Sequence, residues 1–263
     1  MVNHNTVTRS DFNKFPVPKY DQVSVCAPAR LHLGFLDLNG GLGRRFGSLG
    51  ITLDDIRTRL HVRPSDKISG QGPSSARAVR HLKRLVRALD LGDGLEVTVE
   101  EAIPEHVGLG SGTQLALAVG AAVSTLYEFD LGPRQLAPIL DRGRRSGIGI
   151  GSFEGGGVVL DGGQGPDKVT PPVLCRFDFP AGWRILMIFD HRYQGVHGTE
   201  EHEVFRHLPP FPAELSAHFC RLVLMGALPA LAEGDIEGFG DAVAEIQRAT
   251  GDFFRPRPGP PLC

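Results

Sequence analysis

The feature that most constrains the fold of this chain is a glycine-rich turn between a proline and an apolar helical run, within residues 103–118. Glycines 108, 110 and 112 lack side chains where a backbone must turn tightly and approach a ligand. The helix that follows directs its free N–H groups and its positive dipole end back at the turn, a geometry that binds phosphate. A loop that only joins a strand to a buried helix remains the alternative. The predicted phosphate-binding residues are Gly108, Leu109, Gly110, Ser111, Gly112 and Thr113.

Composition narrows the classes of partner. The chain has 263 residues, is 41% hydrophobic and 22% charged, and so reads as an ordinary soluble protein with a sizeable core. With a net charge of −2, the chain has no overall positive potential that would attract nucleic acid or an anionic membrane. A phosphorylated ligand must therefore be bound by local positive groups. The cysteines are scattered without a C-x-x-C pair, which disfavours zinc and fits a reducing, cytoplasmic setting: Cys26, Cys175, Cys220 and Cys263.

Residue patterning predicts an α+β protein. Residues 1–20 are polar, without a signal-peptide core, and read as a loose extension. We expect an N-terminal phosphate-binding domain over 21–165, a Gly/Pro-rich linker over 164–172, and a mostly helical domain over 173–263 that looks truncated because it lacks sheet partners. The expected strands are 22–27, 30–36, two pieces within 50–62, 95–100, 158–160 and 184–189; the expected helices are 77–91, 113–129, 133–145, 199–207, 214–232 and 235–249.

A known family is recognisable from several of these segments taken in order. Residues 27–40, with Pro104 and the Gly-Leu-Gly-Ser run at 108–111, resemble the first two motifs of the GHMP superfamily, which includes galactokinase, homoserine kinase and mevalonate kinase. Further tokens resemble the β-ribofuranosylaminobenzene 5′-phosphate synthase family within it, over about residues 22–254. These tokens are Ala29-Arg-Leu-His32, Asp37-Leu-Asn-Gly40, Arg145-Ser-Gly-Ile-Gly149, Phe153-Glu154, Asp161-Gly-Gly163, His197-Gly-Thr-Glu-Glu201 and Gln247-Arg-Ala-Thr-Gly251.

The resemblance implies a fold and a reaction. The fold is GHMP-kinase-like, with an N-terminal α/β domain built on a mainly antiparallel sheet and a smaller C-terminal α+β domain. The implied reaction condenses 5-phosphoribosyl 1-diphosphate with 4-aminobenzoate, releasing carbon dioxide and diphosphate, as a step towards methanopterin-type cofactors. Mg²⁺ is expected with the diphosphate, whereas no metal held by protein side chains is expected.

An ATP-dependent small-molecule kinase is the alternative activity. Those kinases commonly carry a lysine and then a glutamate in the first motif, where this chain has Arg30 and Leu36. Their second motif usually ends in Ser-Ser-Ala, where residues 111–113 read Ser-Gly-Thr, and the acid of their Ser-Gly-x-Asp element is replaced by Gly149. These departures favour the synthase, while a non-catalytic relic of the fold stays open as a third reading.

Residue chemistry suggests roles for several side chains. Arg30 or His32 can anchor a substrate anion, and Asp37 or Glu154 can stabilise a cationic intermediate as the catalytic carboxylate. Each of these residues also has a purely structural alternative: a surface ion pair for Arg30, a hydrogen-bonded structural histidine for His32, a turn at residue 37, and a loop cap for Glu154. Asn39 and Arg44 complete the predicted substrate-binding set; Asn39 has the turn as its alternative, and Arg44 has a solvated pair with Arg45.

Other readings of the polar residues are weaker. A metal site is one reading of His191, His197, His202 and His207, but His197 and His202 are five residues apart, which is poor spacing for two ligands on one helix. The acidic pair in Leu53-Asp-Asp55 is not followed by the phosphate loop of ordinary phosphoribosyltransferases. The expected partners are the small-molecule substrates, without nucleic acid or membrane. A homodimer is left open.

Overall fold

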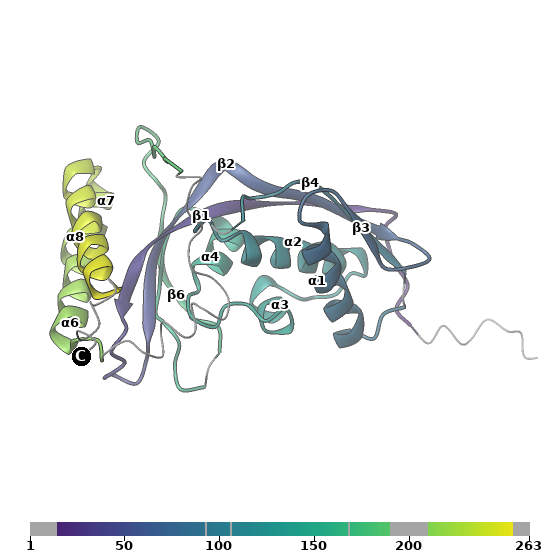
Figure 1. The fold of residues 1–263 in the computed structure, drawn as a ribbon, viewed down its shortest axis with the longest axis horizontal. Coiled ribbons are helices and arrows are strands. Elements are labelled where there is room, and N and C mark those ends of the chain that lie inside the picture. Colours follow the sequence, from purple (N-terminus) through teal and green to yellow (C-terminus); the bar gives the residue numbers. More distant parts are fainter. Residues whose placement is uncertain (1–14, 93, 106, 168, 190–209, 255–263) are drawn as a thin grey trace, which may run out of the picture.

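The computed structural model describes residues 15–92, 94–105, 107–167, 169–189 and 210–254 of the chain. It is an α+β fold in which one six-stranded sheet has helices on both of its faces (Figure 1). The strand order is β3-β4-β2-β5-β6, with β1 paired along β2, and the pairing is antiparallel except between β3 and β4. The predicted α+β class with a mainly antiparallel sheet is therefore confirmed.

The two longest strands of the sheet pair with each other. β1 (Val23–Asp37) and β2 (Phe46–Pro64) pair antiparallel along nearly their whole length. The sequence predicted two shorter strands where the structure has β1 and two where it has β2, and it predicted that Pro28 would end the first of them. That prediction is wrong because Pro28 lies opposite Arg57 and a bulge after it shifts the register, which lets the pairing continue.

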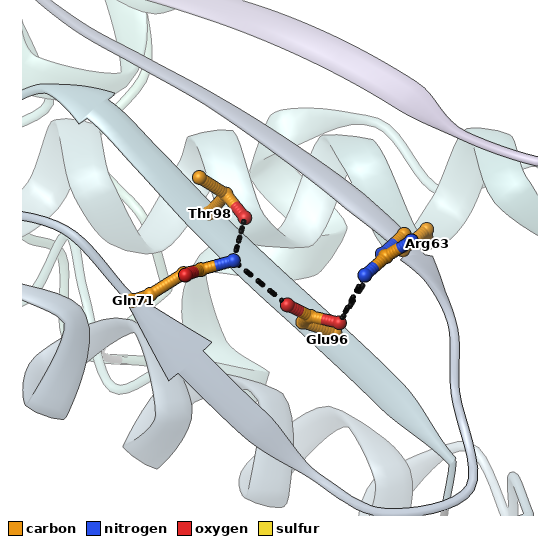
Figure 2. Close-up of polar contacts among 4 residues, drawn as sticks. All are labelled: Arg63, Gln71, Glu96 and Thr98. Carbon is orange, nitrogen blue, oxygen red and sulfur yellow. Dashed lines mark hydrogen bonds and ion pairs between the residues drawn. The ribbon is translucent and has the colours of Figure 1, made fainter.

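At one end of the sheet, polar side chains tie three strands together (Figure 2). Glu96 on β4 (Leu95–Glu101) accepts a 2.7 Å hydrogen bond from Arg63 on β2 and a 2.9 Å bond from Gln71 on β3 (Ser69–Gln71). Gln71 also donates to the Thr98 hydroxyl at 3.3 Å. These cross-strand contacts fix the register of the short parallel strand β3, which the sequence did not predict.

Four helices cover one face of the sheet: α1 (Ser75–Ala88), α2 (Ser111–Leu126), α3 (Pro133–Ile139) and α4 (Ile148–Gly155). α2 is buried on nearly every side, as its apolar composition predicts, and its small residues allow close packing. α3 ends earlier than predicted because Asp141 takes a left-handed φ of 59°. α4 was not predicted, because its glycines are poor helix formers and gave no helical signal. It packs on the sheet opposite Gly50.

A second helical group covers the other face at the far end of β1 and β2 (Figure 1). It consists of α6 (Ala213–Leu222), the π-helical turn η1 (Val223–Ala227), α7 (Leu228–Glu233) and α8 (Ile236–Phe254), which confirms the two predicted C-terminal helices with shifted ends. Phe219 and Ile246 bury fully against this part of the sheet. The predicted helix at 199–207 lies outside the described residues.

The segment between the two helical groups differs from the prediction. β5 (Val158–Asp161) is confirmed, and the expected linker leads directly into β6 (Val173–Phe177), which pairs with β5. The predicted strand at 184–189 is wrong: among the described residues it has no strand partner, although Ile185 and Met187 pack against the sheet. The domain boundary itself stays a prediction.

One helical stretch, Ala213–Glu233, is long and apolar enough to cross a membrane by length and composition alone. Core helices meet the same criterion. Here Phe219, Val223 and Ala227 of this stretch are buried against the sheet and α8, so the finding is weak evidence for a membrane span.

Candidate functional site at the N-terminus of α2

The glycine-rich turn lies against the edge of β1. Gly108 and Gly110 have φ values of 81° and 77°, in the left-handed region that glycine adopts without strain. Gly110 is the N-cap of α2, and the carbonyl of Leu109 accepts a 3.1 Å hydrogen bond from the Arg30 amide. The turn is thereby fastened to β1 with the positive end of a buried helix facing it.

The side chain of Arg30 lies against this turn. Its Nη1 donates to the Gly108 carbonyl at 2.7 Å, and its Cγ and Nε lie 3.1 Å from where a Cβ on Gly110 would stand. Nε is shielded from solvent and has no hydrogen-bond partner among the described residues. Burial lowers the pKa of Arg30 to about 10, and no carboxylate of the described residues offsets that effect. The guanidinium stays charged at neutral pH beside a positive helix end, with no counter-ion in the part of the chain that the structure describes.

His32 follows on the same face of β1. It lies opposite Gly50 of β2, whose missing side chain makes room for Ile148 at the start of α4. Its ring packs on Phe35 at 4.4 Å between centroids, and its Nε2 is buried without a partner among the described residues. Burial, and secondarily the charge of Arg30, lowers the His32 pKa to about 3. The imidazole is therefore neutral and keeps hydrogen-bonding capacity for a ligand.

The start of α4 meets the start of α2 at this site. Gln114 of α2 donates a 2.7 Å hydrogen bond to the carbonyl of Gly149. Buried Asp161 accepts from the amide of Gly147 at 2.8 Å and from the hydroxyl of Ser146 at 3.1 Å, so it fixes the entry to α4. Burial raises the Asp161 pKa, while these hydrogen bonds oppose the rise. The carboxylate is engaged by these donors at the entry to α4.

The predicted catalytic Asp37 and the predicted substrate-binding Asn39 and Arg44 form a separate group at the far end of β1. Asp37 Oδ1 accepts from the amides of Asn39 and Gly40 and from the hydroxyl of Ser216, as the cap of a turn. Seven residues of strand, at about 3.3 Å each, put it roughly 23 Å from Arg30. The structure therefore does not bring Asp37 and Arg30 into one site.

Asn39 and Arg44 lie with Asp37 and also bind backbone. Asn39 Nδ2 donates to the Phe211 carbonyl at 2.6 Å, and the Arg44 guanidinium donates to the carbonyls of Gly162 and Gly163 at 2.7 Å each. Asp37, Arg44 and Leu174 line a cavity of about 190 Å³. These contacts hold the turn after β1 in place, and a substrate role for these residues stays a prediction.

Glu154 lies in the last turn of α4. Its carboxylate forms an ion pair with Arg134 of α3 at 2.9 Å, with both side chains partly exposed. This contact links two helices, and a catalytic role for Glu154 stays a prediction.

Two arginines that the sequence analysis overlooked reach the first turn of α2. Arg77 comes from α1 and Arg142 from the connection between α3 and α4, and both guanidinium groups lie against Gly112. Arg142 also lines a cavity of about 850 Å³ with other arginines. Helical periodicity gave no signal for them, because their convergence depends on tertiary packing. Among the described residues, no group of three or more His, Cys, Asp or Glu is arranged to hold a metal ion.

Comparison with known proteins places this site in context. The profile of the "GHMP kinases N terminal domain" family matches residues 75–157, which include α2 and its turn. The solved structure of Leishmania major mevalonate kinase with R-mevalonate superposes with a TM-score of 0.62 at 14% identity, over 91% of this chain and 78% of that one. At that identity the likeness establishes the shared fold alone.

Curated relatives are considerably closer in sequence. The β-ribofuranosylphenol 5′-phosphate synthase of Methanothermobacter thermautotrophicus is 34% identical over 86% of this chain and 75% of its own length. That of Archaeoglobus fulgidus is 36% identical over 84% of this chain and 74% of its own. Identity at this level along most of both sequences, on the fold that the profile indicates, shows that the chain belongs to the β-ribofuranosylphenol 5′-phosphate synthase family of the GHMP superfamily.

Proposed function

We propose that this chain transfers the 5-phosphoribosyl group of phosphoribosyl diphosphate to a para-substituted benzoate, with loss of carbon dioxide and diphosphate. The observation that carries the proposal is Arg30, a charged guanidinium held against the turn at the N-terminus of α2, for which the described residues supply no counter-ion. Binding an anion there satisfies both the guanidinium and the free helix amides. The family supplies the reaction class, and this geometry supports a phosphorylated donor.

The proposed reaction balances without an oxidant or reductant. The bond from ribose C1′ to the diphosphate oxygen breaks, and a bond forms from C1′ to the ring carbon that bears the carboxylate. The bond from that ring carbon to the carboxylate then breaks, carbon dioxide leaves, and its electron pair restores the aromatic ring. Negative charge grows on the departing diphosphate, where Arg30 and the amides of Ser111 and Gly112 can stabilise it.

The identity of the aromatic acceptor is a separate part of the proposal. The family resemblance implied 4-aminobenzoate, whereas the names of the relatives denote a ribosylated phenol. Because the para substituent survives decarboxylation, a phenol product corresponds to 4-hydroxybenzoate and an aniline product to 4-aminobenzoate. Neutral His32, on the same face as Arg30, can hydrogen-bond either the carboxylate or the para substituent. A place in methanopterin-type cofactor synthesis and a cytoplasmic setting belong to the same proposal.

Mg²⁺ enters the proposal only with the donor. The described residues offer no cluster of carboxylates for a protein-held ion, and Mg²⁺ is commonly bound through substrate phosphates and water. No step above depends on it.

The experiment supplies phosphoribosyl diphosphate, Mg²⁺ and either carboxyl-labelled 4-hydroxybenzoate or 4-aminobenzoate, and measures labelled carbon dioxide. We expect release with at least one acceptor, and loss of a charge-assisted contact in Arg30→Met should lower it about ten- to a hundred-fold. Arg59→Met, which removes the same charge from an exposed position on β2, is the matched control. Absence of release with both acceptors, or phosphoryl transfer from ATP to an alcohol in a parallel panel, would contradict the proposal.

A further inference from the structure

Two arginines from separate elements converge on one residue of the phosphate-binding helix. A Cβ built on Gly112 would lie 2.8 Å from Nη2 of Arg77 and 3.8 Å from Cζ and Nη2 of Arg142. The φ of Gly112 is not in the left-handed region, so backbone conformation does not require glycine there. The absence of a side chain instead leaves room for these guanidinium groups. Arg30 lies against Gly110, two residues earlier in the same turn.

The charges around this point are incompletely balanced. Arg77 pairs with Glu105 at 2.7 Å, but Nε of Arg142 is buried without a hydrogen-bond partner among the described residues. Burial, then the charge of Arg77 and more weakly those of Arg84 and Arg80, lowers the pKa of Arg142, and the charge of Asp141 opposes this shift. His81, also on α1, is held neutral by burial and by the charges of Arg142 and the neighbouring arginines.

The acids nearby are already engaged. Asp141 lies 2.7 Å from Arg144 and 3.9 Å from Arg84, and Glu105 also accepts from the Ser74 hydroxyl. Positive charge therefore accumulates where the helix dipole is positive as well, and each contribution disfavours the others in the absence of an anion. A ligand that brings more than one negative charge removes this repulsion.

The backbone offers matching donors between the two sets of guanidinium groups. The first hydrogen bonds of α2 are donated by Thr113 and Gln114 to the carbonyl of Gly110. The amides of Ser111 and Gly112 precede them and belong to the helix positions that have no partner within the helix. Donors thus lie between Arg30 at Gly110 and the arginine pair at Gly112.

We propose that Arg77 and Arg142 form a second anion subsite at the first turn of α2, which holds one phosphate of a diphosphate group while Arg30 holds the other. This inference rests on the proposed function for the identity of the donor, but the subsite is defined by its chemistry alone. It makes Arg77 and Arg142 binding residues that select a diphosphate over a single phosphate.

The test measures binding of inorganic diphosphate and inorganic phosphate to the full chain by calorimetry. Arg77→Met and Arg142→Met should each weaken diphosphate binding about ten- to a hundred-fold and change phosphate binding by less than about threefold. Arg30→Met should weaken both. Arg87→Met, on the exposed side of α1, is the charge-matched control and should leave both affinities unchanged.

Gly112→Ala probes the same subsite without removing a charge. Alanine suits a helix better than glycine by about 1 kcal/mol, so the melting temperature should not fall. Its Cβ displaces the Arg77 guanidinium, so diphosphate affinity should fall as in Arg77→Met.

Equal losses for phosphate and diphosphate, unchanged affinity in Arg77→Met and Arg142→Met, or failure of the parent to bind diphosphate would overturn the inference. If the expected selectivity appears without ribosyl transfer, the subsite stands and the proposed function fails. If transfer occurs while both variants bind diphosphate normally, the proposed function stands and the subsite fails.

Discussion

The buried histidine on α1 makes the stability of this chain depend on pH in a definite direction. His81 is only 5% exposed, and its Nδ1 has no hydrogen-bond partner among the described residues. Burial, and then the charges of Arg142, Arg84, Arg77 and Arg80, lowers its pKa from 6.5 to about 3. The folded protein therefore holds this imidazole neutral at pH values where the unfolded chain protonates it.

The sign follows from proton counting. Below about pH 6.5 the unfolded chain binds a proton that the folded chain excludes, so the free energy of unfolding falls as the pH falls. The loss is about 1.4 kcal/mol per pH unit and amounts to about 2 kcal/mol at about pH 5. Above about pH 6.5 the contribution is constant.

Urea unfolding of the parent, His81→Leu and His81→Gln, at about pH 7.5 and about pH 5, isolates this contribution. Both variants lack the titrating group although they differ in polarity, so each should lose about 2 kcal/mol less than the parent between the two pH values. Other titrating groups are common to all three proteins and cancel in the comparison. Parallel pH dependence in parent and variants would show that His81 titrates normally, and the reasoning about burial would be refuted.

Three further substitutions separate binding from structure. Gly110→Val should abolish binding of inorganic diphosphate in calorimetry and lower the melting temperature, because valine is strained at a φ of 77° and its side chain meets Arg30; retained affinity would contradict this. Asp37→Ala should lower the free energy of unfolding by about 1–3 kcal/mol through three lost hydrogen bonds, measured in urea, while an unchanged melting curve with reduced turnover would restore its catalytic role. Glu154→Gln breaks a partly exposed ion pair with Arg134 and should cost less than about 1 kcal/mol; a large loss of carbon dioxide release at unchanged stability would instead support catalysis by Glu154.

The parts of the fold that the sequence predicts well are those specified by local chemistry. The turn at Gly108 and Gly110 needs left-handed backbone, and α2 has an apolar composition that few other structures accommodate. Both signals lie within one short stretch of chain. The bulge after Pro28, by contrast, depends on pairing with β2, so the residues around it could not reveal that the strand continues.

The site residues also differ in whether local sequence or tertiary packing determines their position. Arg30 and His32 alternate on one strand and therefore share a face, which the sequence can express. Whether Asp37 joins them depends on the path of the chain over seven further residues and on α6, which engages it through Ser216. Arg142 lies in the connection between α3 and α4, so its contact with Gly112 of α2 depends on tertiary packing and not on a local sequence period.

The stoichiometry of the reaction tests the central claim most directly. With phosphoribosyl diphosphate and 4-hydroxybenzoate or 4-aminobenzoate, we expect carbon dioxide and diphosphate to appear in equal amounts. The product should carry a carbon–carbon bond between ribose C1′ and the aromatic ring, which nuclear magnetic resonance identifies. Diphosphate released without carbon dioxide would indicate hydrolysis of the donor alone, and that result would contradict the account.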